Sequence, residues 1–539
     1  MRNIFKFVCA ALLGLTLTTS CIDEVDPTSV ATDEQIQGSS QSQQALVNGI
    51  AAYMNHWSSG WSDYHYAYGY PSIGLMRDLM CNDVASYGAY YEWYDAWFTN
   101  QYMGQDYVYA QYTWTYLSSL MFTINSVIGV IQPTSEQTKN WLGIAHAYRA
   151  MVRLDMGQMY EFKANPYTSS INSEVNIEGL TIPDLRENMS EEQTRKNPRI
   201  TKAELIEDIR ADVELAIEYL EGFKQVNPSD PTQAVAYGLK ARLHLWEEDY
   251  AAAKEAASMA ISLSGCTPLT EAQWTDPKTG FNSFDSNNSW MWATRLTSES
   301  NLVKTSLLNF SSWMSIENTY GYASVLGGGV YRMADVKFYN RIPFGDFRKK
   351  SWVPMDPSKL QVKYVDGLFS EDFTEDDMPP LASIKFRPGQ GEINDYLIAS
   401  ATDYPLMRVE EMYLIVAECD ARNGDASSLK NFMTAYRNPN YVCNATSAEE
   451  LVEEVMFQKR VEFWGEGRIF FDYKRLALPI NRYYEGTNHH EQSQFNVFDG
   501  VAPWMNFSAV RTENENNPAF VNNPDPSGTV ALMDEDGIK

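Results

Sequence analysis

The stretch from Gln233 to Leu263 reads QAVAYGLKARLHLWEEDYAAAKEAASMAISL. Small and apolar residues recur in it at steps of three and four, first up to Trp246 and again from Tyr250. This is the spacing of two amphipathic helices, and the acidic turn Glu247-Glu248-Asp249 separates them. Alanine-rich faces let two helices pack closely, so the stretch predicts an antiparallel hairpin of the tetratricopeptide type. One such hairpin cannot bury its apolar face alone, and we therefore expect further helix pairs beside it.

Similar patterns predict helices on both sides of this hairpin. They cover residues 43–56, 108–131, 142–160, 202–222, 404–423 and 448–464. The chain between the hairpin and residue 404 is rich in Gly, Pro, Asn and aromatic residues, with short β-prone pieces at 290–294 and 383–387. The predicted fold is therefore mostly α: a tetratricopeptide-like superhelical scaffold that carries an irregular, loop-rich lobe with a few short strands.

The sequence divides into five predicted parts. They are a signal peptide at 1–20, a lipidated flexible tether at 21–42, an N-terminal helical part with an aromatic-rich segment at 43–263, an irregular lobe at 264–403, and C-terminal helices with a loop tail at 404–539.

The N-terminus has the features of an exported lipoprotein. Arg2 and Lys6 precede an apolar run from Phe7 to Leu17, and small or hydroxyl residues then lead to Cys21. Such a segment is typical of a secretory signal and is too short to act as a membrane anchor. Cys21 is the predicted lipidation site, which would hold the chain at a membrane surface. Ordinary cleavage that leaves Cys21 as a free thiol is the alternative.

Composition and motifs argue against several functions. The chain has 42 Lys and Arg against 70 Asp and Glu, a net charge of −28, which disfavours nucleic acid and anionic lipid as partners. No nucleotide-binding, serine-hydrolase or zinc-protease motif occurs, so we expect neither an enzyme nor a cofactor. The loop pair His489-His490 lacks a third placed ligand and the acidic cluster at 371–377 lacks EF-hand spacing, so we expect solvated loops and no metal, with a calcium ion bound at the acidic cluster as the alternative. A glycosidase remains open, because no two of the many carboxylates stand out as a pair.

Four cysteines remain beyond the signal and the predicted lipidation site. They are Cys81, Cys266, Cys419 and Cys443. They are widely spaced, and the sequence alone cannot pair them. We favour mostly buried thiols over disulfides.

The segment from Tyr53 to Tyr116 is the most biased part of the chain. Twenty of its 64 residues are aromatic, it has no lysine, and Arg77 is its single arginine. The rings do not keep to one helical face, so a core stripe does not account for all of them. Tyr and Trp combine an apolar face with a polar handle, which suits stacking on sugar rings. The segment predicts a glycan-binding surface, with burial in the core as the alternative for about half of the rings.

The segment from Arg460 to Arg475 concentrates charge instead. Acidic and basic residues alternate at helical spacing beside Phe463, Trp464, Phe470 and Phe471. This pattern favours a partly buried ion-pair network that locks a helix to its neighbours, rather than a catalytic site.

Taken together, several segments resemble the SusD/RagB family, the surface glycan-binding lipoproteins of Bacteroidota. The segments that carry the resemblance are Ala45–Gly49 with Tyr53, Leu142–Ala150, Ile206–Leu220, Gln233–Leu263, Pro405–Cys419 and Arg460–Arg475. Val213 stands where the family usually has leucine, and Cys419 where it has alanine. The acidic residues Asp23, Glu24 and Asp26 after Cys21 resemble the surface-export signal of such lipoproteins.

The resemblance implies a fold, a partner and a location. It implies four tetratricopeptide-like helix pairs and an irregular lobe with the ligand site. It implies non-catalytic capture of an oligosaccharide or polysaccharide, delivered to a SusC-like TonB-dependent transporter at the cell outer membrane, with the protein lipid-anchored and surface-exposed. A helical-repeat protein that binds peptides or proteins at the outer membrane is the alternative. The residues expected to contact glycan are Tyr90, Tyr91, Trp93 and Tyr94 as stacking rings, Asp83 and Arg77 as hydrogen-bonding groups, and Trp313 and Tyr320 from the lobe.

Overall fold

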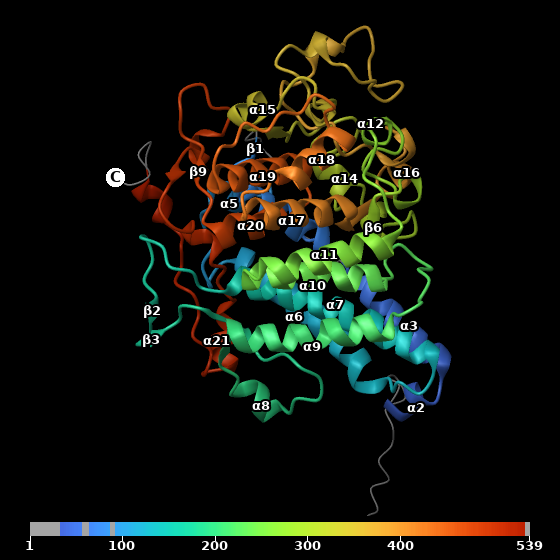
Figure 1. The fold of residues 1–539 in the computed structure, drawn as a ribbon, viewed down its shortest axis with the longest axis vertical. Coiled ribbons are helices and arrows are strands. Elements are labelled where there is room, and N and C mark those ends of the chain that lie inside the picture. Colours follow the sequence, from blue (N-terminus) through green and yellow to red (C-terminus); the bar gives the residue numbers. More distant parts are fainter. Residues whose placement is uncertain (1–32, 57–63, 87–91, 534–539) are drawn as a thin grey trace, which may run out of the picture.

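The computed structural model describes residues 33–56, 64–86 and 92–533, and its fold is mostly helical, as predicted (Figure 1). The longer helices are α3 (Ser40–Tyr53), α6 (Val108–Val130), α7 (Glu136–Tyr160), α9 (Lys202–Tyr219), α10 (Gln233–Glu247), α11 (Tyr250–Ser264), α17 (Val409–Ala421) and α19 (Ala448–Glu462). The shorter helices are α2 (Asp33–Gln37), α4 (Tyr70–Leu79), α5 (Asp95–Thr99), α8 (Glu191–Arg195), α12 (Glu271–Trp274), α13 (Asn301–Lys304), α14 (Phe310–Met314), α15 (Val336–Arg341), α16 (Tyr396–Ala399), α18 (Ser427–Tyr436), α20 (Ile469–Leu476) and α21 (Arg511–Asn516).

The strands are short and form only two-stranded antiparallel sheets within the described residues. The pairs are β1 (Val84–Ser86) with β7 (Arg332–Ala334), β2 (Ile171–Asn172) with β3 (Val175–Asn176), β4 (Leu180–Pro183) with β5 (Arg199–Thr201), β6 (Trp290–Arg295) with β8 (Asp403–Arg408), and β9 (Ile480–Asn481) with β10 (Asn496–Val497). Two of these pairs join distant parts of the chain: β1–β7 ties the early aromatic segment to the lobe, and β6–β8 ties the lobe to the segment that leads into α17.

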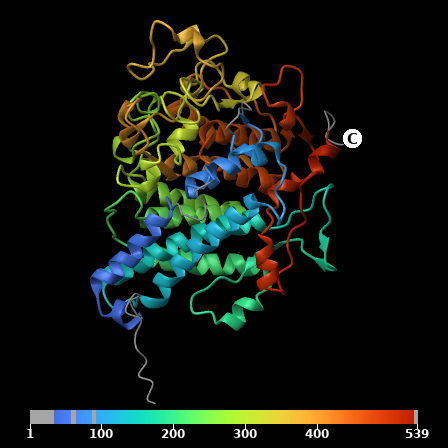
Figure 2. The same ribbon diagram turned by 180° about the vertical axis from the view of Figure 1, so that it is seen from behind.

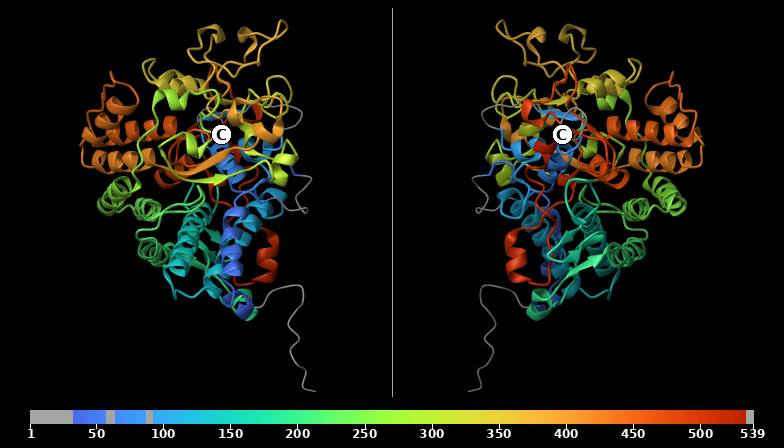
Figure 3. Two further views of the ribbon diagram at one scale, coloured as in Figure 1. Left: turned by 90° about the vertical axis from the view of Figure 1, so that its right-hand side faces the viewer. Right: turned by 90° about the vertical axis from the view of Figure 1, so that its left-hand side faces the viewer.

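The predicted hairpin is confirmed as α10 and α11. The Thr232 side chain caps α10 by accepting a hydrogen bond from the Val235 N–H, and Asp249 caps α11 in the same way. Ala253 and Ala257 are fully buried, because small side chains let the two helices approach closely. The hairpin continues a series in which α6 packs on α7, α7 on α9, α9 on α10, α11 on α17, and α17 on α18 and α19. Figure 3 shows these helices stacked one behind another along one side of the molecule.

Local capping explains where two other helices begin. Thr201 and Glu204 form the predicted capping box of α9. A second box, between Ser135 and Thr138, starts α7 six residues before the predicted 142, because it supplies partners for backbone N–H groups that would otherwise lack them.

Two sequence predictions need correction. Residues 404–408 were expected to open a helix but, together with Asp403, form strand β8, and α17 begins only at Val409. All six strand residues are buried against β6, so pairing across the sheet prevails over local helical preference. The piece at 383–387 forms no named strand; Ser383 makes only an isolated bridge with Trp352.

The lobe and the helices share one hydrophobic core. The main buried cluster runs from Val47 in α3 through Trp313 and Ile384 in the lobe to Trp464 and Trp504 near the C-terminus. A smaller cluster lies between α17, α18 and α19. In Figure 2, the segment that contains α4 and α5 lies against the lobe, on the side of the molecule away from α9, α10 and α11.

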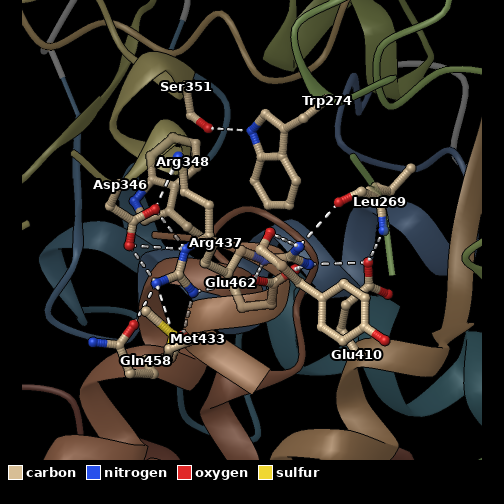
Figure 4. Close-up of polar contacts among 12 residues, drawn as sticks. Leu269, Trp274, Asp346, Arg348, Ser351, Glu410, Met433, Arg437, Gln458 and Glu462 are labelled. Carbon is tan, nitrogen blue, oxygen red and sulfur yellow. Dashed lines mark hydrogen bonds and ion pairs between the residues drawn. The ribbon is translucent and has the colours of Figure 1, made fainter. Parts of the chain in front are cut away.

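A buried network of ion pairs fixes the lobe on the C-terminal helices (Figure 4). Glu462 of α19 accepts hydrogen bonds from Arg437 at 2.8 Å, and from Arg348 and Arg408 at 3.1 Å. These four side chains are almost completely buried. Burial alone would raise the pKa of Glu462, but the guanidinium groups of Arg437, Arg408 and Arg348 hold that pKa below its ordinary value.

Glu410 extends the same network toward the lobe. It accepts from the Leu269 N–H at 2.7 Å and pairs with Arg437 at 3.1 Å. Arg348, which lies in the lobe, also pairs with its neighbour Asp346 at 2.6 Å. The charge pattern between Arg460 and Arg475 therefore has the structural role predicted for it.

The four thiols at Cys81, Cys266, Cys419 and Cys443 are free, two of them buried and two partly buried. No helix in the described part of the chain is long and apolar enough to cross a membrane. The predicted signal peptide and Cys21 lie outside the described residues.

Candidate functional site

Two of the predicted ligand contacts are buried in ion pairs. Arg77 of α4 is fully buried and donates to Asp155 Oδ2 at 2.7 Å. Asp83 is 2 % exposed and accepts from Arg460 Nε at 2.7 Å and from the Tyr473 hydroxyl at 3.2 Å. Both side chains tie the early segment to helices of the scaffold, and neither lies on the molecular surface. Tyr90 and Tyr91 fall outside the described residues.

Trp93 and Tyr94 lie just before α5, and the structure brings both to the lobe. Tyr94 is fully buried, and its ring meets the edge of the Trp313 indole at 4.9 Å between centroids. Its hydroxyl donates to Tyr68 at 2.8 Å, and burial raises its pKa well above the ordinary value. Trp313 is also fully buried. The two predicted rings thus meet, but in the interior.

A second layer of rings lies over this buried pair. Tyr322 stacks on Trp313 with centroids 4.1 Å apart and planes 13° apart. His65 meets Tyr322 edge-on at 5.8 Å, and its Nδ1 is hydrogen-bonded to the Tyr322 hydroxyl. Trp93 stacks on His65 at 4.8 Å and 17°. We call Trp93, His65, Tyr322, Trp313 and Tyr94 the aromatic cluster.

Only the outer members of the aromatic cluster reach the surface. Trp93 and His65 are half-buried, whereas Tyr322 is 7 % exposed. Trp313 holds the arrangement in place by donating from its indole N–H to the His65 carbonyl oxygen at 3.2 Å. The cluster therefore presents a rigid, partly exposed indole and imidazole supported from below by buried rings.

A buried cation supports the aromatic cluster from the side of the lobe. The Arg332 guanidinium lies 5.5 Å from the Tyr94 ring centre and 5.6 Å from that of Trp313. It is paired with Glu92 at 2.6 Å, and Glu92 also accepts from the Tyr94 N–H at 3.0 Å. Together with the β1–β7 pairing, this ion pair positions Trp93 and Tyr94 against the lobe.

Tyr320 lies apart from this stack, on the other side of the same loop. Its hydroxyl is hydrogen-bonded to Ser400 Oγ at 2.9 Å, and its ring meets Tyr396 edge-on at 6.1 Å. Tyr396 is 38 % exposed. Burial raises the pKa of Tyr320 to about 12, so its phenol stays protonated at neutral pH.

Sequence reasoning missed three members of the site. His65 lies within the aromatic-rich segment from Tyr53 to Tyr116 but was not selected, and neither Tyr322 nor Arg332 was considered. Tyr320-Gly321-Tyr322 signalled only that two rings lie close together in one loop. It could not tell which of them would face the early segment.

The structure also places His489, one of the two loop histidines considered above as metal ligands. His489 is buried, with Nε2 3.5 Å from Asp335 Oδ2, and burial lowers its pKa. No group of three or more His, Cys, Asp or Glu side chains suited to a metal ion occurs among the residues that the structure describes.

Comparison with known proteins identifies the architecture first. The chain is similar to a SusD-like carbohydrate binding protein from Bacteroides vulgatus, with 19 % identity, 89 % of this chain and 97 % of that chain covered, and a TM-score of 0.69. It is also similar to a SusD superfamily protein from Bacteroides thetaiotaomicron, with 16 % identity, 90 % of this chain and 99 % of that chain covered, and a TM-score of 0.64. A third similar structure is surface glycan-binding protein A from Bacteroides uniformis, with 16 % identity, 90 % of this chain and 99 % of that chain covered, and a TM-score of 0.62. At these identities the comparisons show the fold: the protein has the SusD-like helical fold.

A match to a protein-family model adds to this likeness of fold. The model of the SusD family matches residues 385–530, which include β8, α17 to α20 and the charged segment from Arg460 to Arg475. A search of curated proteins gave no match. The C-terminal part of the chain thus matches the SusD family, the chain as a whole has the SusD-like fold, and the predicted resemblance is confirmed.

Proposed function

We propose that this protein is a non-catalytic glycan-binding lipoprotein of the outer cell surface, which hands its ligand to a SusC-like TonB-dependent transporter. The observation that carries the proposal is the aromatic cluster, where the half-buried rings of Trp93 and His65 rest on buried Tyr322, Trp313 and Tyr94. Rigid, preorganised rings lose little conformational freedom when a sugar stacks on them, so more of the contact energy becomes affinity.

The rest of the proposal is supported by family and sequence. The match to the SusD family and the printed descriptions of two similar structures, a carbohydrate binding protein and a surface glycan-binding protein, favour glycan as the ligand. The secretory pattern that ends at Cys21 supports lipid anchoring there. Binding proceeds by stacking and hydrogen bonding, and no bond is broken.

The test is binding of purified residues 22–539, which lack the signal peptide and Cys21, to a panel of plant, host and microbial glycans. Affinity electrophoresis finds the class that retards the protein, and calorimetry then gives the affinity. Product analysis after long incubation checks for hydrolysis. We expect retardation by one glycan class with the polymer left intact. Hydrolysis would establish an enzyme instead, and lack of binding across the panel, together with capture of peptides, would favour the alternative of a peptide-binding scaffold.

Anchoring and delivery need a separate measurement in cells. Labelling with a fatty-acid analogue should mark the wild-type protein and not the Cys21→Ala variant. Purification of the wild-type protein from outer membranes should recover a TonB-dependent transporter in stoichiometric amount. Label on the Cys21→Ala variant, or recovery of the protein alone, would contradict these parts of the proposal.

A further inference from the structure

The segment from Lys337 to Lys363 has a charge opposite to that of the chain. It contains seven Lys and Arg residues against two Asp and no Glu, a net charge of +5, in a protein whose net charge is −28. In Figure 1 the segment begins at α15, near the top of the molecule and far from α2 and α8. A local cationic surface on an acidic protein concentrates anions near it.

This segment also forms a pocket of about 330 Å³, which we call the lysine pocket. Its lining residues are Tyr339, Asn340, Phe344, Lys349, Lys350, Trp352, Pro354, Met355, Asp356, Lys359, Leu360 and Gln361. Three lysines thus face a single carboxylate. The volume is at the small end of the range for ligand sites, about 300–1,000 Å³, so the lysine pocket suits a short ligand unit.

Apolar side chains at the lysine pocket are unusually exposed. Phe344 is 78 % exposed and Met355 is 56 % exposed. An isolated apolar side chain on a surface has little meaning, but two that flank one concave site, with aromatic residues in its wall, suit a ligand with an apolar face. Trp352, which is 1 % exposed and lies in this wall, has an indole N–H without a hydrogen-bond partner among the described residues.

Of the three lysines that line the pocket, Lys349 is the one least neutralised by the protein. Its ammonium donates to the Ile342 carbonyl oxygen at 2.7 Å and lies 4.4 Å from the centre of the Tyr339 ring. It forms no ion pair with any described carboxylate, whereas Lys350 pairs with Glu271 at 2.6 Å and Lys359 with Asp356 at 2.7 Å. Burial lowers the pKa of Lys349, opposed only in part by the charge of Asp346. A ligand anion beside Lys349 would supply the missing countercharge.

We propose that the lysine pocket is a second binding site, separate from the aromatic cluster, for a sugar unit that carries a carboxylate. Lys349 binds the carboxylate, and Phe344 packs on the apolar face of the sugar ring. The side-chain amides of Asn340 and Gln361 form hydrogen bonds with the sugar hydroxyls. The choice of a sugar over other carboxylates rests on the proposed glycan-binding function. The site then gives the protein a preference for acidic glycans.

The test uses calorimetry with three probes of matched size or charge. Trigalacturonate carries the sugar rings and the carboxylates, its methyl ester keeps the rings without the charge, and tricarballylate keeps three carboxylates without the rings. We expect trigalacturonate to bind at least about tenfold more tightly than either of the others, since a hydrogen bond to a charged group is stronger than one between neutral groups. Its affinity should also fall as salt is added.

Matched variants assign the binding to the lysine pocket. Lys349→Gln keeps a donor and removes the charge, and Phe344→Ala removes the exposed ring; each should weaken trigalacturonate binding about tenfold. Lys224→Gln, at an exposed lysine outside the pocket, and Phe122→Ala, at a ring that is 73 % exposed on α6, should leave it unchanged. Both pocket positions are at the surface, so melting temperatures should stay near the wild-type value.

Several outcomes would overturn the proposal. Equal affinity for trigalacturonate and its methyl ester would show that the carboxylates do not contribute to binding. Equal affinity for trigalacturonate and tricarballylate would show that the sugar rings do not contribute. Affinity unchanged by Lys349→Gln would place the site elsewhere, as would affinity lost in Trp93→Ala. Failure of trigalacturonate to bind while a neutral glycan binds through Trp93 would reject the lysine pocket and leave the proposed function intact.

Discussion

The imidazole of His65 lies parallel to the indole of Trp93, with centroids 4.8 Å apart and planes 17° apart. The stack covers one face of each ring and fixes the angle at which Trp93 meets the solvent. Replacing Trp93 by alanine should therefore weaken binding of the glycan found in the panel about tenfold or more, because a ring contact contributes about 0.5–1.5 kcal/mol beyond the apolar area it buries. Calorimetry gives the affinity.

A matched surface ring serves as the control for Trp93. Phe122→Ala removes an aromatic side chain that is 73 % exposed on α6 and should leave glycan affinity unchanged. Trp93→Phe should retain part of the affinity, because a smaller ring can still stack. Equal affinity of Trp93→Ala and the wild type would exclude the aromatic cluster as the glycan site.

Gly467 packs directly against Gly74 of α4. A Cβ at Gly467 would overlap the Gly74 Cα and lie 2.7 Å from the Gly74 oxygen, and its φ of +69° is unfavourable for other residues. We expect Gly467→Ala to lower the free energy of unfolding by about 4 kcal/mol or more, measured by urea denaturation. Gly424→Ala is the control, since its φ of +73° is similar and its Cβ would meet nothing within 4 Å; it should cost about 1–2 kcal/mol. Similar losses in the two variants would mean that the Gly74 contact has no cost of its own.

Asp78 is a buried carboxyl that makes stability depend on pH. Burial raises its pKa from 3.8 to about 7, although the Gly467 N–H, which donates to Oδ2 at 2.8 Å, and the charge of Arg77 oppose the rise. The folded state binds the proton more tightly than the unfolded state, so this group's contribution to stability is present below pH 4 and is lost as pH rises toward 7. Asp78→Asn keeps the acceptor for Gly467 and removes the titration.

The difference between Asp78→Asn and the wild type isolates this effect. We expect similar unfolding free energies near pH 4 and a variant that is more stable at pH 8, by up to about 4 kcal/mol for a shift of this size. Urea denaturation at several pH values measures the difference. Parallel curves for the two proteins would show that Asp78 keeps the same pKa in the folded and unfolded states.

Glu462 is the shared partner of three buried arginines, Arg348, Arg408 and Arg437. Glu462→Gln leaves these cations without their common countercharge, and we expect a loss of about 3–5 kcal/mol in unfolding free energy at pH 7. Glu191→Gln disrupts the exposed pair with Arg195 and should cost less than about 1 kcal/mol. A small effect of Glu462→Gln would indicate that the arginines find other partners.

Local signals predicted most of the scaffold. The hairpin of α10 and α11, the capping box of α9 and the strand at Trp290 all depend on residues close together in sequence, and all are present. Strand β8 was missed because its partner β6 lies more than a hundred residues away, and the short apolar run Tyr404–Met407 fits either element. The charged segment near Glu462 was interpreted correctly, because alternating charges beside aromatic residues seldom remain exposed.

The candidate site was predicted less well, for a physical reason. An aromatic-rich composition shows that a segment has many rings, but the burial of each ring depends on which loops pack against each other in the fold. Trp93 and Tyr94 are neighbours, yet one is half-exposed and the other fully buried. The contact of His65 with Tyr322 joins residues 257 positions apart, and no local pattern encodes it.

The common core of the lobe and the helices also limits how a ligand can leave. With no separate core, and with the lobe held by Glu462 and by the β1–β7 pairing, the described structure has no hinge between two bodies. Uptake and escape of a sugar are then governed by side chains and loop segments, which move in nanoseconds to microseconds. We therefore expect association in a single kinetic step whose rate rises linearly with ligand concentration, without a slow opening phase.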